Sequence, residues 1–128
     1  MNRFVVAVVA VLAAGPLAAA PKLDCSIRPA KGTSKAALPG LAKVGQADAQ
    51  KAALTAKGVP AGASVAEAEL EVEKGCLVWS FDLKLPDKAG VQEVMVDAGN
   101  GKVLSSAYES PKAEAAEKAK DRAAKKPD

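Results

Sequence analysis

The clearest pattern in the chain is an alternation of polar and apolar residues between Ala63 and Leu85. In its first half every second position is a glutamate: Glu67, Glu69, Glu71 and Glu73. After Lys74-Gly75 every second position is apolar instead: Leu77, Trp79, Phe81, Leu83 and Leu85. A period of two is typical of a strand with one buried face. The stretch therefore predicts two antiparallel strands joined in a hairpin at Lys74-Gly75.

A two-residue loop at Lys74-Gly75 also fixes how the two predicted strands pair. One face would pair only apolar residues: Val72 with Leu77, Leu70 with Trp79, Ala68 with Phe81, and Ala66 with Leu83. The other face would pair Glu73 with Cys76, Glu71 with Val78, Glu69 with Ser80, and Glu67 with Asp82. A shift of one residue would bury the glutamates, so the pattern itself specifies this register.

A helix is predicted over residues 45–57, before the hairpin. Its alanines recur three and four positions apart, at Ala49, Ala52, Ala53 and Ala56. That spacing gives a narrow apolar face, and Gly58 followed by Pro60 ends the helix. We expect it to lie close against the apolar face of the hairpin, where Trp79 and Phe81 supply much of the buried area.

A second hairpin is predicted after the first, with strands over residues 92–98 and 102–108. Gly99-Asn100-Gly101 forms its turn. Val96 would face either Val103 or Ser105, depending on the loop length. The expected fold is therefore α+β, with one helix packed on a four-stranded antiparallel sheet built from two consecutive β-hairpins.

The two segments that precede this domain have a different composition. Residues 1–20 have a short basic head, an apolar run and then small residues, which is the layout of a secretory signal peptide. Gly15-Pro16 interrupts the run, whereas a helix that spans a bilayer needs roughly twenty apolar residues. We expect cleavage, with an uncleaved anchor as the alternative. Residues 21–44 are rich in proline and glycine and predict an extended arm.

The domain is expected to cover residues 45–109, and residues 110–128 form a tail of alanine and charged residues without an apolar stripe. Glu114 with Lys118 and Asp121 with Lys125 make favourable pairs on a helix. A helix of this length is marginal in water by itself. We expect a frayed helix or a disordered tail, and weak contact with an anionic wall or membrane surface is the alternative.

Two cysteines in an exported chain suggest a disulfide bond. A Cys25–Cys76 bond would close a loop of about fifty residues and stabilise the fold by on the order of 4 kcal/mol. Two independent thiols are the alternative. The expected location is the bacterial periplasm or the surrounding medium.

Composition argues against most enzymes and against nucleic-acid binding. The chain contains no histidine, which excludes Ser-His and Cys-His nucleophiles and most zinc sites. A mildly acidic middle lies between basic flanks, and no aromatic residues alternate with the lysines. We expect a chain that is not an enzyme, without a cofactor, a metal or a nucleic-acid partner.

The glutamate row and Asp82 are the candidate binding residues. Alternate residues of a strand lie about 7 Å apart, too far for neighbouring carboxylates to share one calcium ion. We favour a solvated sheet face. The alternatives are a site for a basic peptide or polyamine, or part of a metal site with Asp82 and further ligands. Nothing in the sequence indicates a pocket around Glu67 and Asp82. Asp97 either pairs with Lys102 at its turn, which we favour, or binds a partner.

The order of these elements resembles the PepSY domain over residues 44–108. The matching pieces are the alanine-bearing helix, "AELEVEKG" at 68–75, "VWSFDL" at 78–83 and "VMVDAGNGKVL" at 94–104. The last piece is the most specific: a strand ends in Val-Asp-Ala and turns through a glycine, Gly101, into Lys-Val-Leu. The chain has Asn100 where relatives often have threonine, and Trp79 where they commonly have tyrosine.

The resemblance implies a small α+β fold without catalytic residues. PepSY-like domains occur in propeptides of thermolysin-type peptidases and in exported bacterial proteins, and their suggested role is to restrain peptidases. We therefore expect an exported binding module that modulates or inhibits a peptidase or other envelope protein, and that adds a partner's strand to a sheet edge. The alternative is an extracytoplasmic sensor of a ligand or cation that uses the acidic face. Without its signal peptide the chain would have no stable membrane span.

Overall fold

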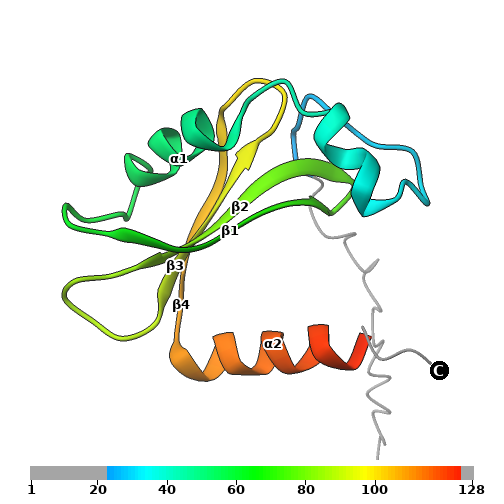
Figure 1. The fold of residues 1–128 in the computed structure, drawn as a ribbon. Coiled ribbons are helices and arrows are strands. Elements are labelled where there is room, and N and C mark those ends of the chain that lie inside the picture. The colour runs from blue at the N-terminus through cyan, green and yellow to red at the C-terminus, as the bar shows by residue number, and fades with distance from the viewer. Residues whose placement is uncertain (1–22, 125–128) are drawn as a thin grey trace, which may run out of the picture.

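The structure is a computed structural model and describes residues 23–124. The elements are η1 (Lys35–Gly40), α1 (Gln46–Leu54), β1 (Ser64–Glu73), β2 (Cys76–Lys84), β3 (Val91–Asp97), β4 (Val103–Glu109) and α2 (Pro111–Ala124). The strands form one antiparallel sheet in the order β1-β2-β3-β4 (Figure 1). The predicted α+β fold with two consecutive hairpins is confirmed. The predicted signal peptide lies outside the described residues.

The register of the first hairpin is confirmed over most of its length. The pairs from Glu73 with Cys76 to Glu67 with Asp82 are those that the alternation predicts. Lys74 has a φ of 49° and Gly75 a φ of 81°. Positive φ at both loop residues is what a tight two-residue hairpin turn requires, and glycine adopts it without steric cost.

The predicted pairing of Ala66 with Leu83 is wrong. A β-bulge lies between Val65 and Glu67, and Leu83 pairs with Val65 instead. The bulge inserts one extra residue into β1. It places Val65 against the apolar core and leaves the small side chain of Ala66 exposed.

The second hairpin is joined by the predicted glycine-rich turn. Val96 pairs with Val103, after a register shift between Met95 and Val96. Gly101 has a φ of 75°, a left-handed conformation that suits glycine. The length of the turn therefore settles which residue faces Val96.

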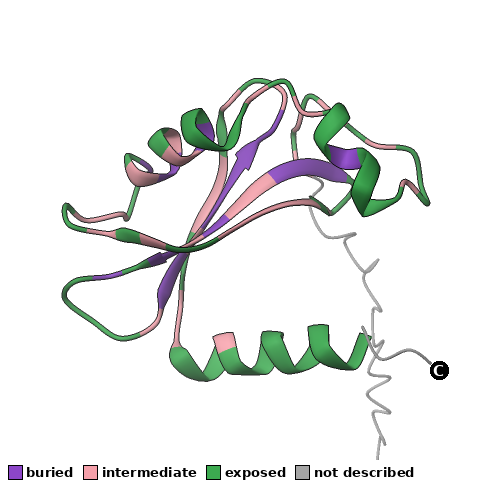
Figure 2. Ribbon diagram, viewed as in Figure 1, coloured by how far each residue is buried: buried purple, intermediate pink, exposed green. Residues whose placement is uncertain are grey.

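The main core lies between α1 and the tryptophan side of the sheet. Ala49 and Ala53 of α1 are fully buried, and they pack with Phe81, Leu83, Val94 and Val96. Trp79 is half-buried, and its indole nitrogen donates a hydrogen bond of 2.8 Å to the carbonyl oxygen of Val44. Figure 2 shows the buried residues concentrated on β2 and β3.

The segment predicted as an extended arm packs onto the sheet. It contains η1, whose Leu38 is only 4% exposed and joins a cluster with Leu77 and Ala98. The backbone nitrogen of Leu77 donates a hydrogen bond to the carbonyl oxygen of Ile27. This segment is thus part of the fold that residues 45–109 were expected to form alone.

The segment predicted as a frayed helix or a disordered tail is helical in the structure from Pro111 to Ala124. This helix, α2, lies on the side of the sheet opposite α1 (Figure 1). None of its residues is buried (Figure 2). Among residues 23–124 no helix is long and apolar enough to cross a membrane.

Candidate functional site

The acidic face of the sheet and α2 enclose a cavity of about 180 Å³, which we call the acidic chamber. Ten acidic side chains and one lysine line it. They are Glu67, Glu69, Glu71, Glu73, Asp82, Glu93, Glu109, Glu114, Glu117, Asp121 and Lys118, with Ser80 beside them. The five carboxylates proposed from the sequence thus lie in one concave site, whereas the sequence had indicated no pocket.

The alternation of the strands positions the sheet side of the chamber. Glu67 of β1 pairs with Asp82 of β2, which in turn pairs with Glu93 of β3. Glu93 pairs with Ala107 of β4, so Glu109, two residues farther on, lies on the same face. Each strand therefore contributes at least one carboxylate to this face.

The side of α2 that faces the sheet is also acidic. Glu114, Glu117 and Asp121 recur at spacings of three and four, which places them on one side of a helix. Lys118 lies between them, and its ammonium forms an ion pair of 2.6 Å with Glu114. That pairing raises the pKa of Lys118. The one lysine of the chamber is thus already engaged by a carboxylate of its own helix.

Enclosure changes the protonation of the chamber. Burial, with the neighbouring charges of Glu69 and Glu73, raises the pKa of Glu71 to about 7. A hydrogen bond with Glu117, together with burial, raises the pKa of Glu109 to about 7. Glu71 and Glu109 are therefore partly protonated near neutral pH, which reduces the negative charge of the chamber.

Burial acts in the same direction on two further carboxylates of the sheet. It raises the pKa of Asp82, and Glu67 adds to the effect. It also raises the pKa of Glu93, where Glu117 of α2 adds to the effect. Full ionisation of the carboxylates in the chamber is thus unfavourable. Binding of a proton or a cation would stabilise them.

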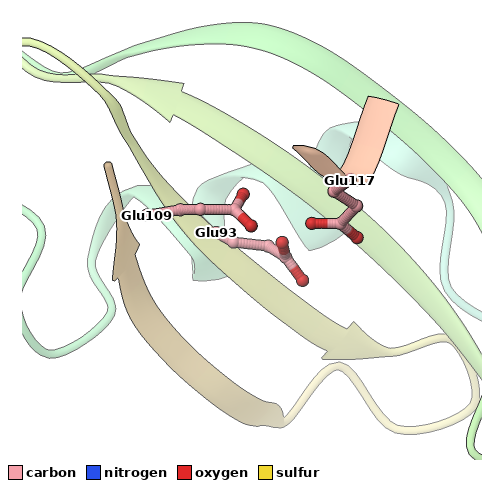
Figure 3. Close-up of side chains that lie close together, drawn as sticks. All are labelled: Glu93, Glu109 and Glu117. Carbon is pink, nitrogen blue, oxygen red and sulfur yellow. The ribbon is translucent and has the colours of Figure 1, made fainter. Parts of the chain in front are cut away.

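Three of these carboxylates converge from β3, β4 and α2 (Figure 3). One oxygen each from Glu93, Glu109 and Glu117 lies within 4.8 Å of the other two. Carboxylate oxygens are ligands that calcium accepts, although calcium takes six to eight oxygens in total. The three carboxylates could therefore supply part of the coordination shell of a calcium ion. Alternatively, protons shared between them would reduce their mutual repulsion.

The contributions of Glu93, Glu109 and α2 to the chamber were not predicted from the sequence. The register of the strands was a sufficient signal for Glu93, because it places this residue opposite Asp82. The spacing of acidic residues along α2 predicts one acidic side. No apolar pattern, however, indicates that this side faces the sheet.

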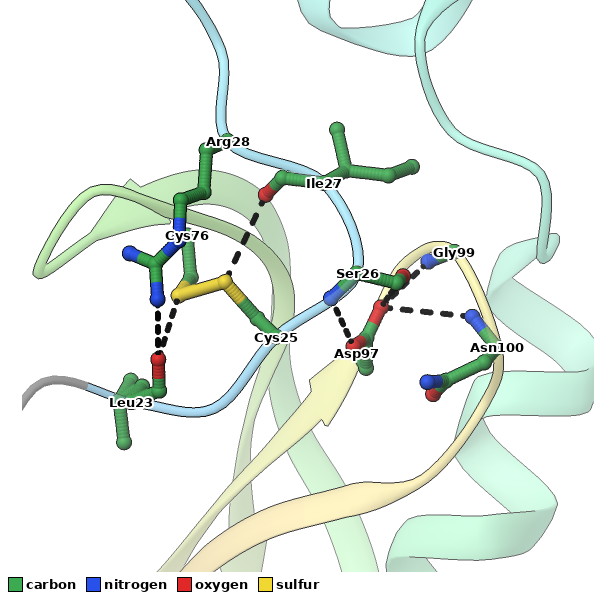
Figure 4. The surroundings of a disulfide bond; sticks show 9 residues. All are labelled: Leu23, Cys25, Ser26, Ile27, Arg28, Cys76, Asp97, Gly99 and Asn100. Carbon is green, nitrogen blue, oxygen red and sulfur yellow. Dashed lines mark hydrogen bonds between the residues drawn. A yellow bond between two sulfur atoms is a disulfide. The ribbon is translucent and has the colours of Figure 1, made fainter.

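Asp97, the other candidate from the sequence, lies beside the disulfide that joins Cys25 to Cys76 (Figure 4). Its side chain is fully buried. Its carboxylate accepts hydrogen bonds of 2.8 and 2.6 Å from the backbone nitrogen and hydroxyl of Ser26, and one of 2.7 Å from the nitrogen of Gly99. Asp97 does pair with Lys102, but through the backbone, where the nitrogen of Asp97 donates a hydrogen bond of 2.8 Å to the carbonyl oxygen of Lys102. The carboxylate instead holds the N-terminal segment and its own turn.

Burial by itself would raise the pKa of Asp97, but the hydrogen bonds outweigh it. Donors at Ser26, Gly99 and Asn100 stabilise the charged form and lower the pKa below its ordinary value. The carboxylate is thus ionised and fully engaged, which indicates a structural anchor.

Comparisons with known proteins return nothing: no family model matches the chain, and neither does any curated protein or solved structure.

Proposed function

We propose that the chain is a non-enzymatic binding module of the bacterial envelope that takes a polycationic ligand in the acidic chamber. One observation carries the proposal. Ten acidic side chains border a single cavity, and the one lysine among them is paired within its own helix. Charges of one sign between low-dielectric walls focus their field and attract ions of the opposite sign.

The spread of the carboxylates favours several linked positive charges over one metal ion. Alternate glutamates along β1 lie about 7 Å apart, so a single ion reaches few of them. A polyamine or a lysine-rich peptide places successive ammonium groups along the row. Each ammonium replaces a proton or relieves repulsion at a carboxylate whose ionisation the chamber disfavours.

Composition and the disulfide support a binding role outside the cytoplasm. The chain has no histidine, and both of its cysteines are bonded to each other. Disulfides persist in oxidising compartments such as the periplasm. The signal-like residues 1–20 agree with export, and cleavage after them belongs to the same proposal.

The resemblance to PepSY domains extends the proposal to a protein partner. A lysine-rich segment of an envelope peptidase has the chemistry that the acidic chamber would bind. Restraint of such a peptidase is the regulatory role that we infer.

Spermine tests the proposal through the thermal unfolding of the exported chain, at about pH 7.5 and about 150 mM salt. Ligand that binds only the folded state raises the melting temperature, here by roughly 5 °C or more at saturation. The variant Glu71→Gln/Glu93→Gln/Glu109→Gln should lose most of this rise. Asp48→Asn/Asp87→Asn, which neutralises two exposed acids outside the chamber, is the matched control and should keep it.

Calcium chloride provides the second arm of the experiment. Stabilisation by spermine that exceeds stabilisation by calcium supports a polycation site. Stabilisation by calcium alone, or an equal response of the triple variant and the control, contradicts the proposal.

A further inference from the structure

A second cavity, of about 290 Å³, runs along the outer edge of β1, and we call it the edge groove. Four consecutive residues of β1, 69–72, line it. Successive side chains of a strand point to opposite faces, so a cavity lined by four in a row lies along the edge of the strand. Thr33, Lys35 and Leu38 of the N-terminal segment and Asp121 of α2 complete the lining.

The outer edge of β1 has free backbone groups. β1 is a terminal strand of the sheet and pairs with β2 alone. In the described part of the chain, no element other than β2 forms a backbone hydrogen bond with residues 69–72. Such an edge presents unpaired N–H and C=O groups to a further strand. Of the two apolar side chains at this edge, Val72 is 42% exposed, whereas Leu70 is half-buried against the cluster of Leu38.

The side chains of the edge specify the chemistry of that strand. Glu69 and Glu71 face the acidic chamber, whereas Leu70 and Val72 face the opposite side. Opposite charges and apolar pairs across neighbouring strands stabilise a sheet. A strand with basic residues at alternate positions and apolar residues between them would meet both faces.

One lysine of the chain already contacts a glutamate of β1 at this edge. Lys35 of η1 forms an ion pair with Glu69, and its side chain is 66% exposed. A basic side chain therefore reaches the glutamates from the edge side, and an exposed ion pair of this kind exchanges at little cost. A second copy of β1 is a poor occupant, because antiparallel or parallel pairing would set glutamates beside glutamates.

We infer that the edge groove receives, by strand addition, an extended segment of a partner protein in which lysine or arginine alternates with apolar residues. The inference rests on the proposed function in one respect, since the basic side chains of the segment would reach the acidic chamber. It adds a backbone-paired position and a sequence pattern for the partner.

A labelled peptide Lys-Val-Lys-Val-Lys-Val, measured by fluorescence anisotropy with the exported chain, tests the pattern. It should bind at least about tenfold more tightly than its isomer Lys-Lys-Lys-Val-Val-Val, because only the alternating peptide satisfies both faces. Two N-methylated versions test the backbone pairing. Methylation of the lysine nitrogens and methylation of the valine nitrogens block opposite edges of the peptide strand. One version should lose about tenfold or more in affinity and the other should keep it.

Charge reversal locates the site. Glu69→Lys/Glu71→Lys should lose the Lys-Val peptide and bind Glu-Val-Glu-Val-Glu-Val, while Asp48→Lys/Asp87→Lys, at two exposed acids elsewhere, should behave as the unmodified chain. Equal melting temperatures of the two variants show that both fold. If the Glu69→Lys/Glu71→Lys variant does not fold, the N-methylated pair on the unmodified chain decides the question.

The outcomes separate this inference from the proposed function. Equal affinity for the alternating peptide, its isomer and both methylated peptides overturns strand addition, while spermine stabilisation still supports the acidic chamber. Binding of the alternating peptide without any effect of spermine supports the edge groove and overturns the polycation site. Dimerisation in sedimentation that Glu69→Lys/Glu71→Lys changes would assign the groove to a second copy and overturn the inference.

Discussion

The buried carboxylate of Asp97 connects residues that are far apart in the sequence. Ser26, which donates two hydrogen bonds to it, lies 71 positions earlier. Gly99 and Asn100 donate from the turn that follows. One side chain therefore fixes both the N-terminal segment and the second hairpin.

Replacing Asp97 by alanine should lower the free energy of unfolding by about 2–4 kcal/mol, because buried donors lose a charged acceptor. Urea unfolding measures the loss, and Asp87→Ala in an exposed loop is the matched control. The pKa of Asp97 is lowered in the fold, so its contribution is complete above about pH 4 and is lost as the pH falls through the folded value. Equal urea midpoints for the two variants would contradict the anchor role.

The sequence indicates a role for Asp97 at its turn, but it does not indicate the contact with Ser26. The Val-Asp-Ala-Gly pattern places an aspartate at a turn, and two of its hydrogen bonds do go to that turn. Ser26 lies in a segment without periodicity, so no local pattern predicts which strand it meets. Contacts of this kind depend on where the disulfide holds the N-terminal segment.

At the scale of elements, the strands and α2 differ in what holds them. The strands have an apolar face, and their register follows from it. The bulge at Ala66 escapes this reasoning, because alanine is compatible with either face. α2 has no buried residue, so the hydrophobic pattern that predicts strands says nothing about where it docks. Its position depends on the charges that it shares with the sheet.

Docking of α2 should depend on pH. Glu109 faces Glu117 of α2, Glu93 of β3 and Asp82 of β2, and its pKa is raised to about 7 from an ordinary 4.5. A raised pKa means that the docked state binds the proton more tightly. This contribution is complete below about pH 4.5 and is lost as the pH rises through about 7. We therefore expect α2 to be held more firmly to the sheet at about pH 5 than at about pH 8.

Relaxation of backbone ¹⁵N nuclei in α2 measures this change, since a helix that is held less firmly moves more independently of the sheet. Glu109→Gln/Glu117→Gln should hold α2 equally firmly at both pH values, because the proton is no longer required. Asp24→Asn/Asp48→Asn, at exposed acids outside the chamber, should hold α2 less firmly at the higher pH, as the unmodified chain does. Identical relaxation of the unmodified chain at the two pH values would show that protons do not control docking.

The molecule as a whole has a small core that depends on its N-terminal segment. Of the seven buried residues between α1 and the sheet, three are alanines. Leu38 of η1 adds a second cluster with Leu77 and Ala98. The sequence predicts the sheet and α1 from their periodicity, but it places the domain boundary at residue 45. The N-terminal segment packs through a few isolated residues, so no periodic pattern of apolar residues indicates that it belongs to the fold.

The disulfide holds this segment to the sheet, so its reduction should affect the whole fold. Cys25 and Cys76 are 51 positions apart, and Cys76 is fully buried. Opening a loop of about fifty residues should lower the free energy of unfolding by on the order of 4 kcal/mol, a large share of the stability of a domain this small. Urea unfolding with and without dithiothreitol measures the effect. Cys25→Ala/Cys76→Ala should be equally stable under both conditions, which isolates the bond from other effects of the reductant. If the unmodified chain unfolds at the same urea concentration in both conditions, the packing of Leu38 and the hydrogen bonds of Asp97 hold the segment without the bond.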